Sequence, residues 1–328
     1  MHSHLLKEGR NAIDIVALGE LLIDFACLNT DADGYPTMAA YPGGAPANFL
    51  AALTKYGAQT ALLGKVGDDA FGAMLVRTRA EAGIETRGIV VDESVFTTLA
   101  FVTFDDQGDR AFSFARKPGA DTQLRFEELD LSLIDEAKVF HFGTLSLTDQ
   151  PVKAATEQAV SYAKERGKWI TFDPNLRKPL WKDLEEARNA ILWGLHQADF
   201  VKISDEEVDF LWGCDEKTAG EKLLTEFHVK LALITMGAKG AYLVNRAGFA
   251  YSDSPTVTPI DTTGAGDICG GSAVSQLLKI GKPMEFLNQS ELEQVVRFAS
   301  TAASLSTEKS GGIPSIPEYE EVLDAQKI

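Results

Sequence analysis

The chain has 328 residues, enough to bury a large core, so we expect one large domain or one core with a smaller appendage. Its formal net charge of −17 excludes nucleic acid as a partner, because nucleic-acid phosphates require a basic face. No apolar run is long enough to span a bilayer, and the N-terminus lacks the apolar centre of a signal peptide. We therefore expect a cytoplasmic protein without a membrane partner.

Apolar, β-branched segments alternate with amphipathic segments along most of the chain. This alternation predicts an α/β fold with a mainly parallel sheet covered by helices on both faces. In chain order, the predicted strands are 13–19, 61–66, 139–142, 169–172, 200–203, 232–235 and 241–244. The predicted helices are 47–56, 71–81 and 151–166, with further long helices after Gly264.

Residues 95–116 break this pattern, because two β-prone runs flank a polar turn that contains Gly108. This arrangement is typical of a β-hairpin, and residues 21–26 and 38–41 are candidate partner strands. The segments from about 21–41 and 92–116 would form a small sheet on a single domain that covers 11–328. Each run would expose an apolar face, so we predict a lid that closes over a substrate and excludes water. The alternative is a structural β-meander.

The strongest glycine pattern lies late in the chain, at Asp261-Thr-Thr-Gly-Ala-Gly-Asp267, before a helix expected to begin near Ile268. Three small residues there let consecutive backbone N–H groups point at one place, and the helix N-terminus favours an anion. The pattern predicts an anion hole for a transferring phosphoryl group, with Asp267 as the base that deprotonates an acceptor hydroxyl. For Asp267 alone, the alternative is a helix N-cap. The small residues are Gly264, Ala265 and Gly266.

Residues 261–274 resemble the C-terminal signature of the ribokinase-like (phosphofructokinase-B type) carbohydrate kinases. The N-terminal signature is also present, as Gly43-Gly-Ala-Pro-Ala-Asn48, with Gly57 and Gly67 at the family spacing. The resemblance extends from about residue 14 to 317. It implies a ribokinase-like three-layer core with a mainly parallel sheet and a small β-sheet lid. It also implies an ATP-dependent sugar kinase that uses Mg²⁺.

Two positions depart from the family signatures. Leu50 stands where a small residue is usual, and Ser272 stands where Ala or Gly is usual. Both positions concern packing beside the site, so the expected activity is unchanged.

The resemblance implies a sugar-binding turn and a carboxylate that binds the sugar. Asp24 matches the carboxylate that accepts hydrogen bonds from two sugar hydroxyls, which suits a vicinal diol. Gly43, Gly44 and Asn48 match the turn that contacts the sugar, where missing side chains let the backbone approach a ligand.

Four further residues could complete the sugar side of the site. From the hairpin, Phe101 and Phe112 would offer an apolar wall, with a core position as the equal alternative, and Arg116 would reach toward the sugar. Arg177 lies in Asp173-Pro-Asn-Leu-Arg177, which resembles the family's Asp-x-Asn-x-Arg segment. It is the candidate to clamp substrate or phosphate, and a surface salt bridge is the alternative.

On the nucleotide side, Ser204 stands in the Asn place of the family's Asn-x-x-Glu motif. Glu207 in that motif would help to hold the Mg²⁺ environment through water, as this strongly hydrated ion prefers. The glycines after the strand 232–235 would make room for the phosphates and ribose of ATP. The implied nucleotide-binding residues are Ser204, Thr235, Gly237, Gly240, Gly264 and Gly266.

The loop 306–315 resembles the segment that closes the adenine pocket, and in many relatives it also holds a potassium ion. We treat K⁺ as an optional second ion, which would help to order the anion hole. Its candidate ligands are Asp261, Thr263, Ser306, Lys309, Gly311 and Ser315.

Within the family, the sequence is most similar to fructokinases, on residues 19–25, 43–48, 116–121 and 173–177. The implied reaction is the transfer of phosphate from ATP to the 6-hydroxyl of D-fructose. Ala115 stands where 2-keto-3-deoxygluconate kinases carry an aromatic residue, which favours a neutral hexose. A kinase for 2-keto-3-deoxygluconate or a related sugar stays an alternative. A nucleoside kinase and a non-catalytic sugar-binding relative are weaker ones. The expected partners are a small-molecule sugar and ATP, with a homodimer through the lid as an option.

Overall fold

The computed structural model describes residues 12–104 and 110–327, with the backbone alone for 102–104 and 110–112. Within these residues, the main sheet has nine strands. The seven strands from β11 to β5 are parallel, and β12 and β13 extend the sheet as an antiparallel edge. In spatial order the strands are β13 (Gly248–Ser252), β12 (Ala241–Asn245), β11 (Leu231–Thr235), β10 (Phe200–Ser204), β9 (Trp169–Asp173), β8 (Val139–Gly143), β1 (Ile15–Leu18), β4 (Thr60–Gly67) and β5 (Ile89–Asp92).

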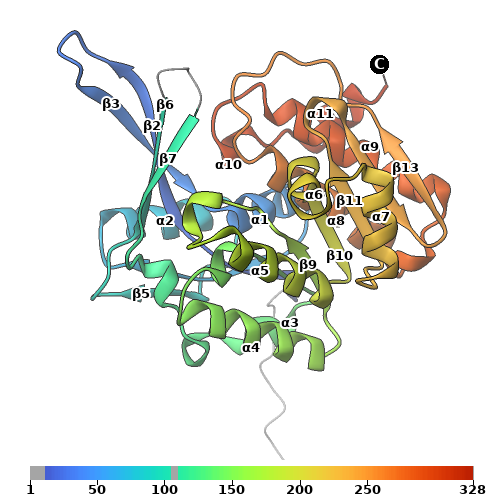
Figure 1. Ribbon diagram of the computed structural model, residues 1–328, viewed down its shortest axis with the longest axis horizontal. Coiled ribbons are helices and arrows are strands. Elements are labelled where there is room, and N and C mark those ends of the chain that lie inside the picture. Colours follow the sequence, from blue (N-terminus) through green and yellow to red (C-terminus); the bar gives the residue numbers. More distant parts are fainter. Residues whose placement is uncertain (1–11, 105–109, 328) are drawn as a thin grey trace, which may run out of the picture.

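Helices cover both faces of the main sheet (Figure 1). Alternate residues of β1 enter two separate cores, because successive side chains of a strand point to opposite faces. The core that contains Ile15 and Ala17 is closed by α1 (Ala45–Lys55), α2 (Ala70–Glu81), α8 (Ala265–Ile280), α9 (Gln289–Ser306) and α11 (Tyr319–Ala325). The core that contains Val16 and Leu18 is closed by α3 (Leu131–Glu136), α4 (Val152–Glu165), α5 (Leu184–Gln197), α6 (Asp205–Trp212) and α7 (Glu216–Thr225).

Shorter helical turns connect these elements. The four-residue helix α10 (Gly312–Ser315) contacts α1 and α9. The 3₁₀ turns are Ala120–Gln123, Phe126–Glu128, Leu145–Leu147, Lys178–Leu180, Gly237–Lys239 and Met284–Phe286.

A second sheet projects from the main body (Figure 1). Its order is β3 (Pro36–Gly43), β2 (Leu22–Thr30), β6 (Thr98–Phe104) and β7 (Arg110–Ala115). The hairpin β6–β7 pairs with β2 in parallel, and β2 pairs with β3 antiparallel. The predicted pairing of residues 21–26 with the hairpin is therefore confirmed, whereas residues 38–41 pair with β2 and not with the hairpin. We call these four strands the lid sheet.

The predicted fold class is confirmed, and the structure corrects two local boundaries and adds two strands. Helix α8 begins at Ala265, not near Ile268, because Gly264 takes the N-cap position at a φ of 77°. Asp92, the expected first residue of the second lid segment, ends β5 in the main sheet. The strands β5 and β13 were not predicted, since each is short and shows no clear alternation.

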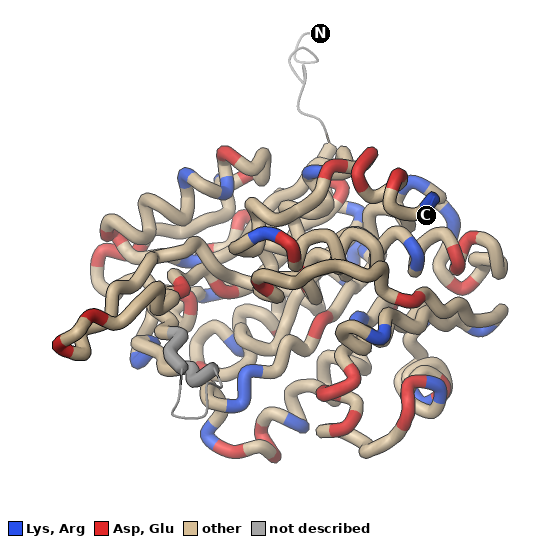
Figure 2. The backbone as a smooth tube through the Cα atoms, turned by 90° about the horizontal axis from the view of Figure 1, so that it is seen from above, with Lys and Arg blue, Asp and Glu red and all other residues tan. Residues whose placement is uncertain are grey.

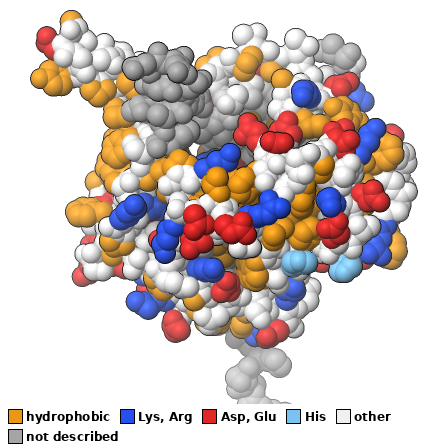
Figure 3. Space-filling view, in the orientation of Figure 1, with side chains coloured by type: hydrophobic (Ala, Val, Ile, Leu, Met, Phe, Trp, Pro, Cys, Tyr) orange, Lys and Arg blue, Asp and Glu red, His pale blue; other side chains and the backbone are white. Residues whose placement is uncertain are grey.

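Charged residues are spread over the molecule. Acidic and basic positions are interspersed along the chain in Figure 2, and side chains of both signs share the face shown in Figure 3. Among the described residues, no helix combines the length and apolar character needed to cross a membrane.

Candidate active site

The N-terminus of α8 carries the predicted catalytic carboxylate. Gly264 is the N-cap in the left-handed region, which glycine adopts without strain, and Asp267 is the third residue of the helix. The first turn of a helix leaves backbone N–H groups without intrahelical partners, so the N–H groups of Gly266 and Asp267 are placed for an anion. The N–H of Ala265 donates instead to the Thr262 carbonyl, at 3.2 Å. The structure does not use Asp267 as an N-cap.

The Asp267 carboxylate is buried and has one side-chain partner on another helix. Nδ2 of Asn48, in α1, donates to its Oδ2 at 2.9 Å. Burial raises the pKa of Asp267, while the hydrogen bond from Asn48 and the charge of Lys202 favour its ionised form. Within the described residues, Oδ1 of Asn48 is buried without a hydrogen-bond partner. An acceptor beside the base is therefore ready for a donor such as a sugar hydroxyl.

Close packing around Asn48 explains two of the glycines near the site. A Cβ on Gly264 would lie 3.1 Å from Nδ2 of Asn48, and a Cβ on Gly312 would lie 2.4 Å from its Oδ1. Side chains at either position would displace the amide that holds Asp267.

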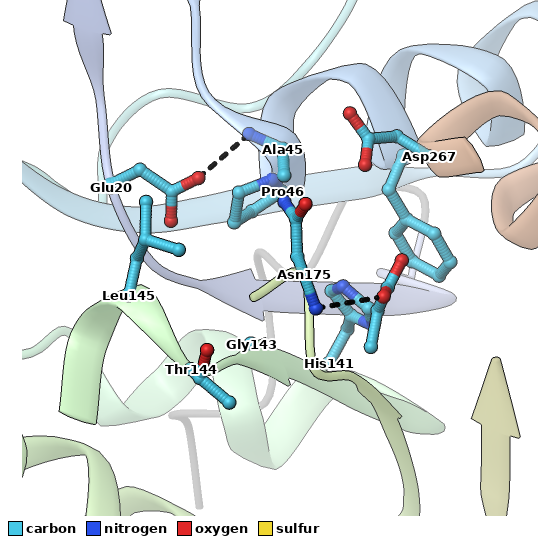
Figure 4. A pocket seen from close by; sticks show the side chains of 11 residues that line it. Glu20, Ala45, Pro46, His141, Gly143, Thr144, Leu145, Asn175 and Asp267 are labelled. Carbon is cyan, nitrogen blue, oxygen red and sulfur yellow. Dashed lines mark hydrogen bonds between the residues drawn. The ribbon is translucent and has the colours of Figure 1, made fainter. Parts of the chain in front are cut away.

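A small pocket opens beside Asp267 (Figure 4). It lies where β1, β8 and β9 end, at the carboxyl edge of the parallel sheet, which is where open α/β sheets bind ligands. Of the predicted site residues, Asp267 lines this pocket at the end of the main sheet. Its lining residues are Glu20, Ala45, Pro46, Phe49, His141, Gly143, Thr144, Leu145, Asp173, Asn175 and Asp267.

Asp24 lies at the root of the lid sheet, against the glycine turn that follows β3. A Cβ on Gly43 would lie 2.1 Å from Oδ2 of Asp24, so only glycine leaves room for this carboxylate. Gly44 has a φ of 121°, and a Cβ there would lie 2.5 Å from the carbonyl of Glu20. Burial raises the pKa of Asp24 to about 6, and the nearby charges of Arg177 and Arg79 oppose this shift.

Arg177 is exposed, yet its charge acts on both carboxylates of the site. It follows β9 and the residue Asn175, which adopts a positive φ of 46°. Its position beside Asp24 and Asp267 agrees with the predicted place at the substrate, and its clamping role stays a prediction.

The surroundings of Phe101, in the lid sheet, differ from those predicted. Phe101 stacks on Phe25 with ring centroids 5.3 Å apart, and Phe25 packs edge-on against Phe71 of α2. Because Phe25 and Phe101 are neighbours in the parallel register, Phe101 shares the face of Phe25, opposite to that of Asp24. In this conformation the packing of Phe101 favours the alternative, a core position, and its contact with the sugar stays a prediction. The side chain of Phe112 lies outside the described residues.

Arg116 is held inside the protein by several partners. Its guanidinium forms an ion pair with Asp121 at 2.7 Å and donates to Oγ1 of Thr148 and the carbonyl of Leu145. These bonds anchor the end of the lid hairpin to the loop after β8, and the predicted reach toward the sugar stays a prediction.

A buried ion pair lies beneath the N-terminus of α8. Nζ of Lys202, in β10, is 3.1 Å from Oδ2 of Asp173, at the end of β9. A Cβ on Gly266 would lie only 2.9 Å from that Nζ, so the glycine lets the helix N-terminus approach the ammonium. The charge of Asp173 raises the pKa of Lys202 against the effect of burial. Lys202 therefore adds a fixed positive charge below the predicted anion hole.

Glu207 joins two neighbouring strand ends. Its Oε1 accepts from the N–H of Leu176, at 2.8 Å, and its Oε2 accepts from the N–H of Ser204, at 2.9 Å. Ser204 in turn caps α6. Among the described residues, no cluster of three or more acidic, histidine or cysteine side chains forms a metal cage. A carboxylate held by backbone N–H groups fits contact with Mg²⁺ through water, so the predicted role stays open.

The predicted nucleotide loop follows Thr235, the last residue of β11. Gly237 has a φ of 54° and open space where a Cβ would stand, and a Cβ on Gly240 would lie 2.0 Å from the carbonyl of Ser252. The two glycines thus serve different needs, since the first leaves a free surface and the second permits close backbone packing. Their contact with ATP stays a prediction.

The predicted potassium loop is assembled around Asp261. Its carboxylate accepts from the N–H of Thr263, at 2.9 Å, and from the N–H of Gly311, at 3.0 Å. The hydroxyls of Ser306 and Ser315 donate to helix carbonyls, and Lys309 offers a cation rather than a ligand side chain. Backbone carbonyls are the natural ligands of K⁺, and the binding of this ion by the loop stays a prediction.

Three buried polar residues near the pocket escaped the sequence analysis. Lys202 and His141 each interrupt an otherwise apolar strand, and Glu20 directly follows β1. The imidazole of His141 stacks on Phe49, and burial lowers its pKa to about 3, so the ring is neutral. A polar residue inside a buried strand was the available signal.

Comparison with known proteins identifies the family of the chain. The family model described as pfkB family carbohydrate kinase matches residues 12–319. Fructokinase-1 of Zea mays is 39% identical over 313 residues, which is 94% of this chain and 96% of that protein.

Two solved structures share the fold. A fructokinase of Xylella fastidiosa with bound ATP superposes with a TM-score of 0.87 and 30% identity, over 96% of this chain and 98% of that one. A fructokinase double mutant of Vibrio cholerae O395, bound to fructose, ADP and potassium ion, superposes with a TM-score of 0.83 and 27% identity, over 97% and 100% of the two chains.

Proposed function

Because this chain belongs to the pfkB family of carbohydrate kinases, we propose that it is a fructokinase, which transfers the terminal phosphoryl group of ATP to the 6-hydroxyl of D-fructose. The observation that carries the proposal is the buried Asp267 carboxylate at the N-terminus of α8, bonded to Asn48 and facing the pocket at the sheet edge.

In the reaction, Asp267 accepts the proton of the 6-hydroxyl while the hydroxyl oxygen attacks the γ-phosphorus. The new oxygen–phosphorus bond forms as the bond to the ADP oxygen breaks, and ADP carries away the electron pair. The N–H groups of Gly266 and Asp267 stabilise charge on the transferred group, and Lys202 lies below them.

Residues at the root of the lid sheet and in α1 orient the sugar. The carboxylate of Asp24 accepts from two hydroxyls remote from the reacting carbon, and the unpaired Oδ1 of Asn48 accepts a further hydroxyl. Closure of the lid sheet would exclude water, so that phosphate goes to the sugar rather than to solvent.

Two ions complete the proposal. Glu207, held by backbone N–H groups, would contact Mg²⁺ through water, and the ion would supply positive charge to the phosphates of ATP. K⁺ would be held by backbone carbonyls of the loop around Gly311, where Asp261 already joins the two segments.

A cytoplasmic location and a homodimer through the lid belong to the same proposal. The lid sheet and its β2–β3 turn expose Leu28, Tyr35 and Tyr41, with 60%, 71% and 40% of their surfaces accessible. Exposed apolar side chains gathered on a projecting sheet support a protein contact there. Light scattering after size-exclusion chromatography gives the number of chains directly.

A coupled assay of ADP release over a panel of sugars and sugar acids tests the function. The panel contains fructose, mannose, 2-keto-3-deoxygluconate and adenosine, each with ATP and Mg²⁺. We expect the highest kcat/KM with fructose. A preference for 2-keto-3-deoxygluconate or adenosine would refute fructose as the substrate. No turnover with any of the four compounds would refute the kinase activity.

A further inference from the structure

The buried face of helix α2 contains an arginine, although its other buried residues are small or apolar. The buried residues of α2 are Gly72, Leu75 and Arg79, and Arg79 is 0% exposed. Among the described residues, Arg79 has no carboxylate within ion-pair distance. Burying an unpaired guanidinium is costly, and an apolar side chain of similar size would stabilise the helix better. Stability alone therefore does not explain Arg79.

The bonds of Arg79 lead to the sugar side of the site. Its Nη2 donates to the carbonyl of Gly43 at 2.6 Å, and its Nη1 donates to Oγ1 of Thr78 at 3.1 Å. Within the described residues, its Nε is buried without a partner. The one strong bond of this buried cation thus fixes the peptide at the end of β3.

The same peptide carries the glycine against which Asp24 packs. Oδ2 of Asp24 lies 2.1 Å from the place of a Cβ on Gly43. Arg79 and Asp24 also act on each other through charge, and the pKa of Arg79, lowered by burial to about 10, leaves it protonated at neutral pH. The other charged groups that act on Asp24 are Arg177 after β9, Asp267 in α8 and Asp261 before α8.

We propose that Arg79 is a positioning residue for sugar binding, which acts from behind the site through the Gly43 carbonyl and the charge of Asp24. This role rests on the proposed function, because it assumes that Asp24 binds the sugar. Arg79 itself touches neither sugar nor nucleotide. Its charge favours the ionised Asp24, which accepts hydroxyl hydrogen bonds better than the protonated acid.

The test compares Arg79→Met with Arg79→Lys and with Arg77→Met as the matched control. Arg77 lies on the same helix, exposed, in a surface pair with Glu81. Steady-state kinetics give KM and kcat for fructose and for ATP. We expect R79M to fold, to raise the KM for fructose on the order of 10-fold, and to change the KM for ATP less than about 2-fold. R79K should recover part of the loss, and R77M should match the wild type.

The pH profile separates positioning from a structural role. Loss of the Arg79 charge raises the pKa of Asp24, so the acid limb of kcat/KM for fructose should move to higher pH in R79M. An unchanged KM and pH profile in folded R79M would overturn the proposal. If R79M does not fold, Arg79→Gln is measured in its place, because glutamine keeps a hydrogen-bond donor without the charge. A profile of R79Q identical to that of the wild type would then overturn it.

The proposed function fails separately from this inference. If the wild-type protein ignores fructose but phosphorylates another sugar of the panel, the fructose proposal falls, and the same variants are compared with that sugar. If the wild type phosphorylates fructose and R79M does so equally well at every pH, only the role of Arg79 falls.

Discussion

Nδ2 of Asn48 lies 2.9 Å from Oδ2 of Asp267, although 219 residues separate them in the chain. The bond joins α1 to α8, the two helices that bring the two halves of the site together. It holds the carboxylate in one orientation and favours its ionised form, as a base requires.

Replacing Asp267 tests the base directly. Asp267→Asn keeps the size of the side chain but removes the proton acceptor. We expect kcat to fall by about 10²–10⁴, with fructose and ATP affinities within a few-fold of wild type. Steady-state kinetics and calorimetric titration give both quantities. A variant with near-wild-type kcat would remove Asp267 from this role.

Asn48→Leu should change the pH dependence of the reaction. Without the donated hydrogen bond, the pKa of Asp267 rises further, because the bond favours the charged form. A base with a higher pKa is protonated at higher pH, so the acid limb of kcat should move upward. The kcat of the variant and the wild type is measured across pH 5 to 9. A limb that stays in place would show that the bond does not tune Asp267.

The ion pair between Lys202 and Asp173 predicts a strong coupling in stability. Lys202→Met leaves a buried carboxylate without its partner, which should cost about 3–5 kcal/mol in the free energy of unfolding. The double variant K202M/D173N removes both charges and should lose less than the sum of the single variants. Urea unfolding of the three proteins measures the coupling. Lys222→Met, in an exposed pair with Glu226, is the matched control and should change little.

The lid sheet should become more protected when fructose binds. Asp24 lies in β2, so bonds from the sugar would hold the lid root against the core. Hydrogen exchange is followed in peptides of β2, β3 and residues 98–101, with and without saturating fructose. The control peptide is β12, the second strand from the far edge of the main sheet. Equal exchange in both states would make the lid sheet a structural meander.

Sequence reasoning reached the fold and the carboxylates by different routes. The alternation of strands and helices follows from local periodicity, which a single chain displays in full. Asn48 and Asp267 were found because they belong to two long signatures, and Asp24 was found through the wider family resemblance. Neither route finds the bond between Asn48 and Asp267, since only the packing of α1 on α8 brings them together.

Other features depend on which way a side chain faces. The hairpin pattern predicted the strand that contains Phe101, but the register with β2 turns this ring to the face away from Asp24. The sequence gives no sign that Arg79 is buried, and only the structure shows it behind Gly43. Periodicity places residues on elements, whereas long-range pairing decides their partners.

Asp24 gives the sharpest test of the sugar pocket. Its carboxylate should accept from two hydroxyls of fructose, and each hydroxyl left unpaired in a buried site costs about 1–3 kcal/mol. Asp24→Ala should therefore weaken fructose binding roughly 10-fold to more than 100-fold. A non-hydrolysable ATP analogue should bind as before, because the nucleotide is expected at the opposite side of the α8 N-terminus.

The pH dependence of binding supplies an internal check on the same residue. Burial raises the pKa of Asp24 to about 6, so wild-type affinity for fructose should fall as the pH drops through that value. Asp24→Asn cannot ionise, and its weaker binding should be flat over the same range. Calorimetric titration of both ligands at pH 5, 6 and 8 covers all three proteins. If fructose binds to D24A unchanged, or if both ligands weaken together, Asp24 holds the lid root in place instead of binding the sugar.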